Sequence, residues 1–381
     1  MDIRHRWRCN AYYTSTRQSG DFRGFSGAVI GGSNSTNQGT ESNITTGLLP
    51  NYLSVSGKTR QNDLDVGFTI SLNPGASTTH SGIQNGRDGS AALNQENRQA
   101  FLTFGDKSWG SIKLGKDLGI YASDAILNDM TLLGVGSFAG ASAGNTTTLG
   151  RIGTGFMYAD WKSQIAYSSP NWNGFSFTGG VTQAWDVQSA IGTAVSTGRG
   201  GASPAFEGKA SYEWAGDFGG KVWVSGISQK VKGLTALGFA GTKSDTADAF
   251  DVGATVNVAG FGLTGYYGQG SGMGTTIQLR DGYDELGNAR DSEDYYVQAT
   301  YTIPTVGTKL GVSYGKSTLD SNGVTDGDIA NEYSNKMWTL GAYHPITKHL
   351  NLVAEYSDVK TKIDAAKGTS KTISLGAILF F

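Results

Sequence analysis

The chain has 381 residues, of which 38% are hydrophobic and 16% are charged, with a formal net charge of −2 at pH 7. A mean hydropathy of −0.27 and the lack of any run of roughly 20 apolar residues exclude membrane-spanning helices. The near-neutral charge argues against nucleic-acid binding, and the single cysteine excludes a disulfide framework or a Cys-rich metal cluster.

Residues 1–20 contain no apolar core of the kind found in secretory signal peptides. We predict that they form an irregular N-terminal segment, followed by one β-barrel domain over residues 21–381. An exported form of this protein would carry its signal peptide ahead of the present sequence.

After residue 20, period-two alternation between turn residues predicts sixteen strands. They lie near residues 21–31, 51–60, 62–72, 97–106, 110–117, 162–169, 174–184, 204–215, 219–230, 247–258, 261–270, 293–302, 307–317, 334–344, 349–359 and 369–381.

The connections between these strands alternate between short turns and long loops. The long ones cover residues 32–50, 73–96, 118–161, 185–203, 231–246, 271–292, 318–333 and 360–368. Short turns at one end and long loops at the other are typical of transmembrane β-barrels. An even number of strands brings the beginning of the first strand and the end of the last strand to the same side of the membrane. Pairing of these two strands closes the barrel and satisfies the backbone groups that lipid cannot.

Alternation also predicts which way each side chain points. Leu53 and Val55 are expected to face lipid, whereas Ser54, Lys58 and Arg60 are expected to face the lumen. A polar, charged interior implies water, and sixteen strands are enough to enclose an aqueous channel. The fold class is therefore an all-β, sixteen-stranded antiparallel transmembrane barrel.

The third long connection follows the predicted strand at 110–117. Its first part, residues 118–150, contains Asp124 and Asp129 but no Lys, Arg or Glu. Glycines at 134, 136, 140 and 144 would let this segment fold back tightly. The last strand alternates up to Phe381, and a terminal aromatic resembles the assembly signal of Gram-negative outer-membrane barrels.

Three stretches together resemble the general porins of the β- and γ-proteobacteria: residues 97–105 (NRQAFLTFG), 109–119 (WGSIKLGKDLG) and 165–177 (IAYSSPNWNGFSF). The likeness is strongest over residues 95–185 and extends over 21–381. It implies a homotrimeric barrel whose third loop folds inward and sets acidic residues opposite a basic wall.

Transferred to this chain, the resemblance makes Asp124 and Asp129 the loop acids and Lys116 the counterpart of a wall arginine. Alternation separately points Lys113, Lys162, Lys58 and Arg60 into the lumen. The sequence departs from the family pattern in lacking a Pro-Glu-Phe-like turn in the loop and in using Lys where Arg is usual, and lysine is the more flexible point charge.

Carboxylates gather in two outer loops, over residues 281–294 and 320–332. They suggest a Ca²⁺ or Mg²⁺ site through oxygen ligands, but no EF-hand-like spacing is present, so solvation of the loops is the simpler interpretation. We expect no resident metal or cofactor.

The sequence therefore predicts a passive diffusion porin in the outer membrane of a Gram-negative bacterium. Its expected partners are two further copies of itself, outer-membrane lipid and lipopolysaccharide, and the ions and small hydrophilic solutes that pass through. A substrate-specific channel is the main alternative. A barrel enzyme or an adhesin is disfavoured because no catalytic constellation appears, and a soluble β-propeller because no blade repeat appears.

Overall fold

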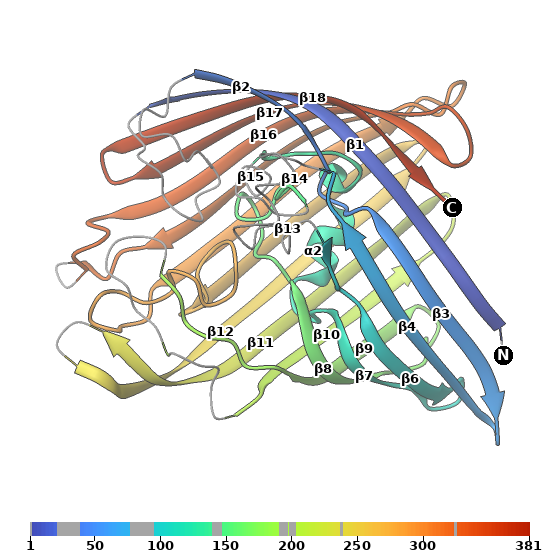
Figure 1. The fold of residues 1–381 in the computed structure, drawn as a ribbon, viewed down its shortest axis with the longest axis horizontal. Coiled ribbons are helices and arrows are strands. Elements are labelled where there is room, and N and C mark those ends of the chain that lie inside the picture. The colour runs from blue at the N-terminus through green and yellow to red at the C-terminus, as the bar shows by residue number, and fades with distance from the viewer. Residues whose placement is uncertain are drawn as a thin grey trace, which may run out of the picture.

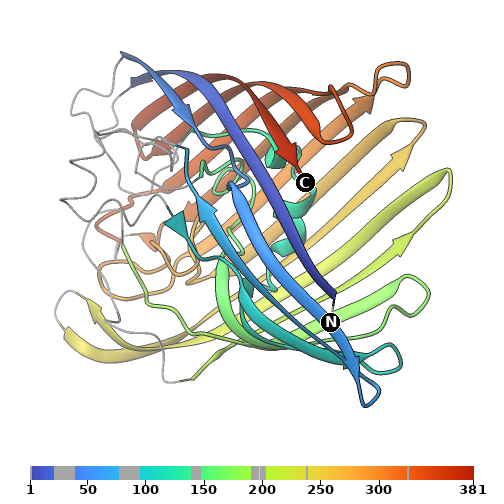
Figure 2. The same ribbon diagram turned by 45° about the vertical axis from the view of Figure 1, so that its right-hand side comes forward.

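The computed structural model describes residues 2–20, 39–76, 95–138, 147–189, 197, 203–236, 239–323 and 326–381. In these residues the strands form one antiparallel sheet whose first and last strands pair with each other, so that the sheet closes into a barrel (Figures 1 and 2). This confirms the predicted sixteen-stranded antiparallel barrel.

The chain order of elements is β1 (Asp2–Gly20), β2 (Gly39–Thr45), β3 (Tyr52–Gln61), β4 (Leu64–Pro74), β5 (Gln95–Glu96), β6 (Ala100–Asp106), β7 (Gly110–Leu118), α2 (Ser123–Asn128), η2 (Met130–Leu133), β8 (Trp161–Ser168), β9 (Phe175–Thr182), β10 (Ala205–Trp214), β11 (Phe218–Ala236), β12 (Phe239–Val258), β13 (Phe261–Ser271), β14 (Asp291–Thr302), β15 (Lys309–Asp320), β16 (Glu332–Pro345), β17 (Leu350–Ile363) and β18 (Ala366–Phe380).

Eighteen labelled strands fill sixteen positions because two of them share positions with their neighbours. β2 and β3 follow each other along β1, with Thr45 opposite Tyr12 and Tyr52 opposite Arg8. β5 is a two-residue strand that pairs with the end of β4. The predicted strands from 51–60 onward are all present, whereas the predicted strand at 21–31 lies outside the described residues.

The prediction that residues 1–20 are irregular is wrong, because Asp2–Gly20 form β1, which closes the barrel against β18. Its alternation is present but disguised by charge. Ile3, Trp7 and Tyr13 share the outer face and are about half exposed, while Asn10 and Tyr12 are buried on the inner face. Arginines on that inner face made the segment appear too polar for a membrane strand.

Two of the predicted long connections are also wrong. β11 and β12 continue pairing up to Ala236 and Phe239, so strand replaces much of the expected loop at 231–246. β17 and β18 pair up to Ile363 and Ala366, which leaves a tight hairpin in place of a loop at 360–368. The strands extend past the apolar belt because backbone pairing needs no apolar side chains.

Large apolar side chains cover the outside of the barrel. Ile70, Leu263, Val297, Leu340 and Leu375 are each more than half exposed, which lipid contact explains. The short turns and both termini gather at one end, and the long connections at the other (Figure 1). No helix in the described parts of the chain is long and apolar enough to cross a membrane.

Candidate functional site

The described parts of the third connection between β7 and β8, residues 119–138 and 147–160, lie inside the barrel, where α2 is visible between the walls (Figure 2). Barrel side chains donate hydrogen bonds to its backbone oxygens. Tyr296 Oη on β14 donates to Ala125 O (2.9 Å), and Tyr12 Oη on β1 donates to Leu133 O (2.5 Å). These donors lie on distant strands, so the connection is attached across the lumen.

A glutamate on β10 holds the beginning of the third connection. Glu207 accepts hydrogen bonds from the backbone N–H groups of Ile120 (2.8 Å) and Tyr121 (3.0 Å). The same carboxylate pairs with Lys162 on β8 at 2.6 Å, and both side chains are fully buried. Lys162 therefore lies on the inner face, as alternation predicted, but it pairs with the glutamate that holds the connection and is not exposed to the lumen.

A second glutamate, on β17, holds the middle of the connection in the same way. Glu355 accepts from the N–H groups of Val135 (2.8 Å) and Gly136 (2.9 Å) and from Tyr343 Oη (2.6 Å). Gly134 lies so close that a Cβ there would be 2.1 Å from Glu355 Oε1. This approach requires glycine, and charge-assisted hydrogen bonds to N–H groups are among the stronger ones.

Asp124, on α2, meets two wall lysines that sequence analysis did not single out. Lys221 Nζ on β11 lies 2.6 Å from Asp124 Oδ1, and Lys209 Nζ on β10 lies 3.0 Å from Oδ2. Burial alone would raise the pKa of Asp124, but the two lysines outweigh it and hold that pKa below its ordinary value. Alternation on β10 and β11 was the signal that would have found them.

Asp129 does not reach these lysines. Its side chain is fully buried, accepts a hydrogen bond from Thr131 N (3.0 Å) at the start of η2, and lies 3.8 Å from Arg151 Nε. Burial raises the pKa of Asp129, although Arg151 and the Thr131 hydrogen bonds oppose that shift. The residue caps a short helix within the connection.

The two lysines of β7 face opposite sides of the barrel. Lys113 pairs with Thr103 on the inner face and forms an ion pair with Asp117. Lys116 pairs across β7 and β8 with Ser163 in the outward register. Residues three apart on a strand always face opposite ways, so placing both in one wall was an error of register.

Lys58 and Arg60 lie on the inner face of β3 near the short-turn end. Arg60 is bound to Asp65 (3.0 Å) and Asp106 (2.8 Å). A cavity of about 860 Å³ opens at this end of the lumen, and its lining includes Arg4, Arg6, Lys58 and Arg60. The β1 arginines were missed because residues 1–20 were not recognised as a strand.

The acidic outer loops contain a buried ion pair. Arg290 Nη2 lies 2.6 Å from Asp326 Oδ1, with both side chains buried. Within the described ranges no group of three or more His, Cys, Asp or Glu side chains is arranged to hold a metal ion. The buried ion pair between Arg290 and Asp326 accounts for the carboxylates nearest to Arg290.

A family model for Gram-negative porins matches residues 15–364 of this chain, while no curated protein sequence matches it. The outer membrane channel DcaP of Acinetobacter baumannii superposes with a TM-score of 0.69 at 15% identity, covering 100% of this chain and 97% of that one. The anion-selective porin from Comamonas acidovorans gives 0.63 at 16%, covering 100% and 99%. A trimer form of OmpT from Vibrio cholerae gives 0.56 at 13%, also covering 100% and 99%.

Proposed function

Because this chain belongs to the Gram-negative porin family and is therefore an outer-membrane channel, we propose that it selects ions and small hydrophilic solutes by size beside the third connection and by charge at the lumen wall. The observation that carries this proposal is the attachment of that connection inside the lumen by Glu207 and Glu355. A connection held at two points across the barrel narrows the path that solutes take.

Charge selection depends on the side chains of the lumen whose charge no partner neutralises. Asp124 is neutralised by Lys209 and Lys221, and Asp129 is buried. Among the described residues, no carboxylate forms an ion pair with Arg6 or Lys58, which line the cavity at the short-turn end. Rings of basic side chains favour anions, so we propose a preference for anions over cations.

The experiment is a planar-bilayer recording under a KCl gradient. Replacing Arg6 and Lys58 together by Glu is expected to shift the reversal potential toward cation selectivity, because four charge units change at the lumen wall. The matched control replaces Lys230 and Lys232 by Glu, since both lie exposed on the outer face of β11. A folded Arg6→Glu/Lys58→Glu variant whose reversal potential equals that of the control would refute the proposed selectivity.

The same recording tests the proposed assembly. The V. cholerae OmpT structure described as a trimer form has the same fold. We propose a homotrimer here, for which conductance steps are expected to come in groups of three.

A substrate-specific channel is the second candidate, favoured by the line of Arg4, Arg6 and Arg8 along one strand of the lumen wall. A basic ladder of this kind suits phosphate or carboxylate groups. A specific channel would show conductance that saturates with, or is blocked by, an organic anion, whereas a diffusion porin would show a linear dependence on concentration.

A further inference from the structure

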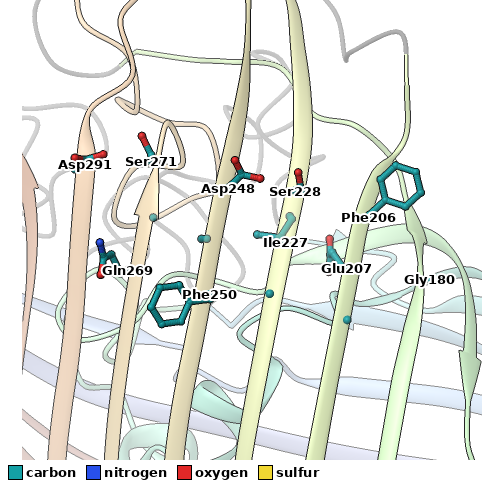
Figure 3. A pocket seen from close by; sticks show the side chains of 14 residues that line it. Gly180, Phe206, Glu207, Ile227, Ser228, Asp248, Phe250, Gln269, Ser271 and Asp291 are labelled. Atoms are coloured by element: carbon teal, nitrogen blue, oxygen red, sulfur yellow. The ribbon is translucent and has the colours of Figure 1, made fainter.

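One apolar side chain of the third connection is exposed inside the barrel. On the outer face, large apolar side chains meet lipid, as Phe206 and Phe250 do beside the groove in Figure 3. Leu127 is exposed to a similar extent, at 53%, but it lies on α2 within the barrel (Figure 2). Water contact with a leucine is unfavourable, and a bound apolar group would remove it. Leu127 is therefore a candidate contact for a ligand.

Two half-buried leucines of η2 lie near Leu127. We call apolar ledge the set formed by Leu127, Leu132 and Leu133, because all three line one cavity of about 510 Å³ at the short-turn ends of β12 to β15. The barrel wall supplies polar groups to the same cavity, among them the side chains of Thr255, Asn257, Thr300, Thr302 and Lys309. An apolar surface with a few polar groups and one cation is typical of a site for a small molecule.

The apolar ledge is held in place against the wall of this cavity. Gln298 on β14 accepts a hydrogen bond from Met130 N (2.9 Å) and donates one to Asn128 O (2.7 Å). The wall is also kept thin, because Gly262 on β13 has no side chain to occupy the space between Asn257 and Thr300. The cavity is thus formed before any ligand enters, which lowers the entropic cost of binding.

Lys309 on β15 supplies the positive charge of the cavity. Its Nζ lies 5.0 Å from the centroid of the Tyr343 ring, and within the described ranges no ion pair joins it to a carboxylate. Asp129 also lines the cavity, but its carboxylate is fully buried, lies 3.8 Å from Arg151 Nε and accepts from Thr131 N. The ammonium group of Lys309 is therefore available to an anionic group of a ligand.

We propose that this cavity binds small amphipathic monocarboxylates, with the carboxylate at Lys309 and a short aliphatic tail on the apolar ledge. One cation suits one carboxylate, and leucine side chains suit a saturated chain. The inference rests on the proposed function, since the ligand must enter the lumen. It concerns a different site, because β12 to β15 lie on the other side of the barrel from the strands that carry Arg6 and Lys58.

The test measures binding of three small molecules to the full-length protein in lipid nanodiscs by saturation-transfer NMR, with empty nanodiscs as the background. Hexanoate carries both the charge and the tail, acetate lacks the tail, and hexanamide lacks the charge. We expect hexanoate to bind at least about tenfold more tightly than acetate, because burial of about two CH₂ groups gives that factor.

Two single variants separate the tail from the charge. Leu127→Ser is expected to weaken hexanoate binding roughly fivefold or more and to leave acetate binding unchanged. Lys309→Gln is expected to weaken hexanoate and acetate by the same factor and to leave hexanamide unchanged. The matched controls are Val306→Ser, an exposed apolar residue in a short turn, and Lys113→Gln, a lysine on the inner face of β7. Heat-dependent gel migration shows that each variant is folded.

Three results would overturn the proposal. Equal binding of hexanoate and acetate to wild type, or full hexanoate binding by Leu127→Ser, would remove the apolar ledge as the contact of the tail. Equal weakening by Lys309→Gln and Lys113→Gln would show a response to the overall charge of the lumen. Planar-bilayer recordings on the same proteins keep the two proposals apart: anion-selective current without hexanoate binding refutes only this inference, and hexanoate binding without anion-selective current refutes only the proposed selectivity.

Discussion

At the scale of single residues, the charge of Asp124 serves attachment more than selectivity. Its two lysine partners come from adjacent strands and are each about a quarter exposed or less. Removing Asp124 takes the carboxylate partner from Lys209, while Lys221 keeps Glu213 at 3.0 Å. The acid that sequence reasoning assigned to the constriction is therefore expected to affect the position of α2 as well as the field in the lumen.

The ion pairs of Asp124 predict how its contribution to stability changes with pH. Because the pKa of Asp124 is lowered by its lysines, the ion pairs stabilise the folded protein above the ordinary carboxyl pKa near 3.8 and lose that effect as pH falls through the lowered value. We expect Asp124→Asn to lower the melting temperature at pH 7, and to lower it progressively less as the pH falls below about 3.8. Thermal unfolding followed by circular dichroism in detergent measures both.

Asp129→Asn is the matched control. Burial raises the pKa of Asp129, so the charged form disfavours folding as pH rises through the raised value. Asn can also cap η2. We therefore expect no loss of stability at pH 7 from Asp129→Asn, and a loss as large as that of Asp124→Asn would contradict this account of the two acids.

At the scale of elements, the third connection depends on the glutamates that hold it. Replacing Glu355 by Gln removes the charge that two N–H groups and Tyr343 contact, at a cost of roughly 1.5–3 kcal/mol for hydrogen bonds to a charged group. We expect larger and noisier single-channel conductance and faster proteolysis within residues 119–160. Glu293→Gln, on the outer face of β14, is the control, and identical conductance in the two variants would argue against a narrowing role for the connection.

The strands from β3 onward could be predicted from the sequence because period-two alternation is strong wherever one face meets lipid, as along Leu350 to Tyr356. β1 could not, since Arg4 and Arg6 mask the alternation of Ile3 and Trp7. Alternation gives the face of a side chain but not its depth in the barrel. It therefore could not distinguish Lys162, buried beneath the connection, from Lys58 at the open cavity, and it says nothing of which loop residue each wall residue meets.

At the scale of the whole molecule, the barrel is closed by the two ends of the chain. β1 pairs with β18 from Arg8 opposite Phe380 to Gly20 opposite Gly368. Beyond that ladder, Trp7 N donates to Phe381 O (2.9 Å) and Phe381 N donates to Trp7 O (2.8 Å). Closure removes the sheet edges, which lipid cannot satisfy, so no part of the barrel is stable in the membrane until the last strand has paired.

A substitution of the terminal aromatic residue can distinguish an effect on assembly in cells from an effect on the stability of the barrel. The side chain of Phe381 is 68% exposed and stacks on His349, while its hydrogen bonds to Trp7 come from the backbone. If the ring acts as an assembly signal, Phe381→Ser should sharply reduce the folded barrel recovered from outer membranes but barely change refolding from urea into detergent. In both settings, the fraction of folded barrel is measured from the difference in gel migration between unheated and heated samples.

The control is Leu375→Ser, on the lipid-facing side of β18. It is expected to reduce both the recovery from outer membranes and the refolding into detergent. Equal losses for Phe381→Ser in cells and in detergent would show that the ring acts only through stability, because a signal read by the assembly machinery has no effect where that machinery is absent.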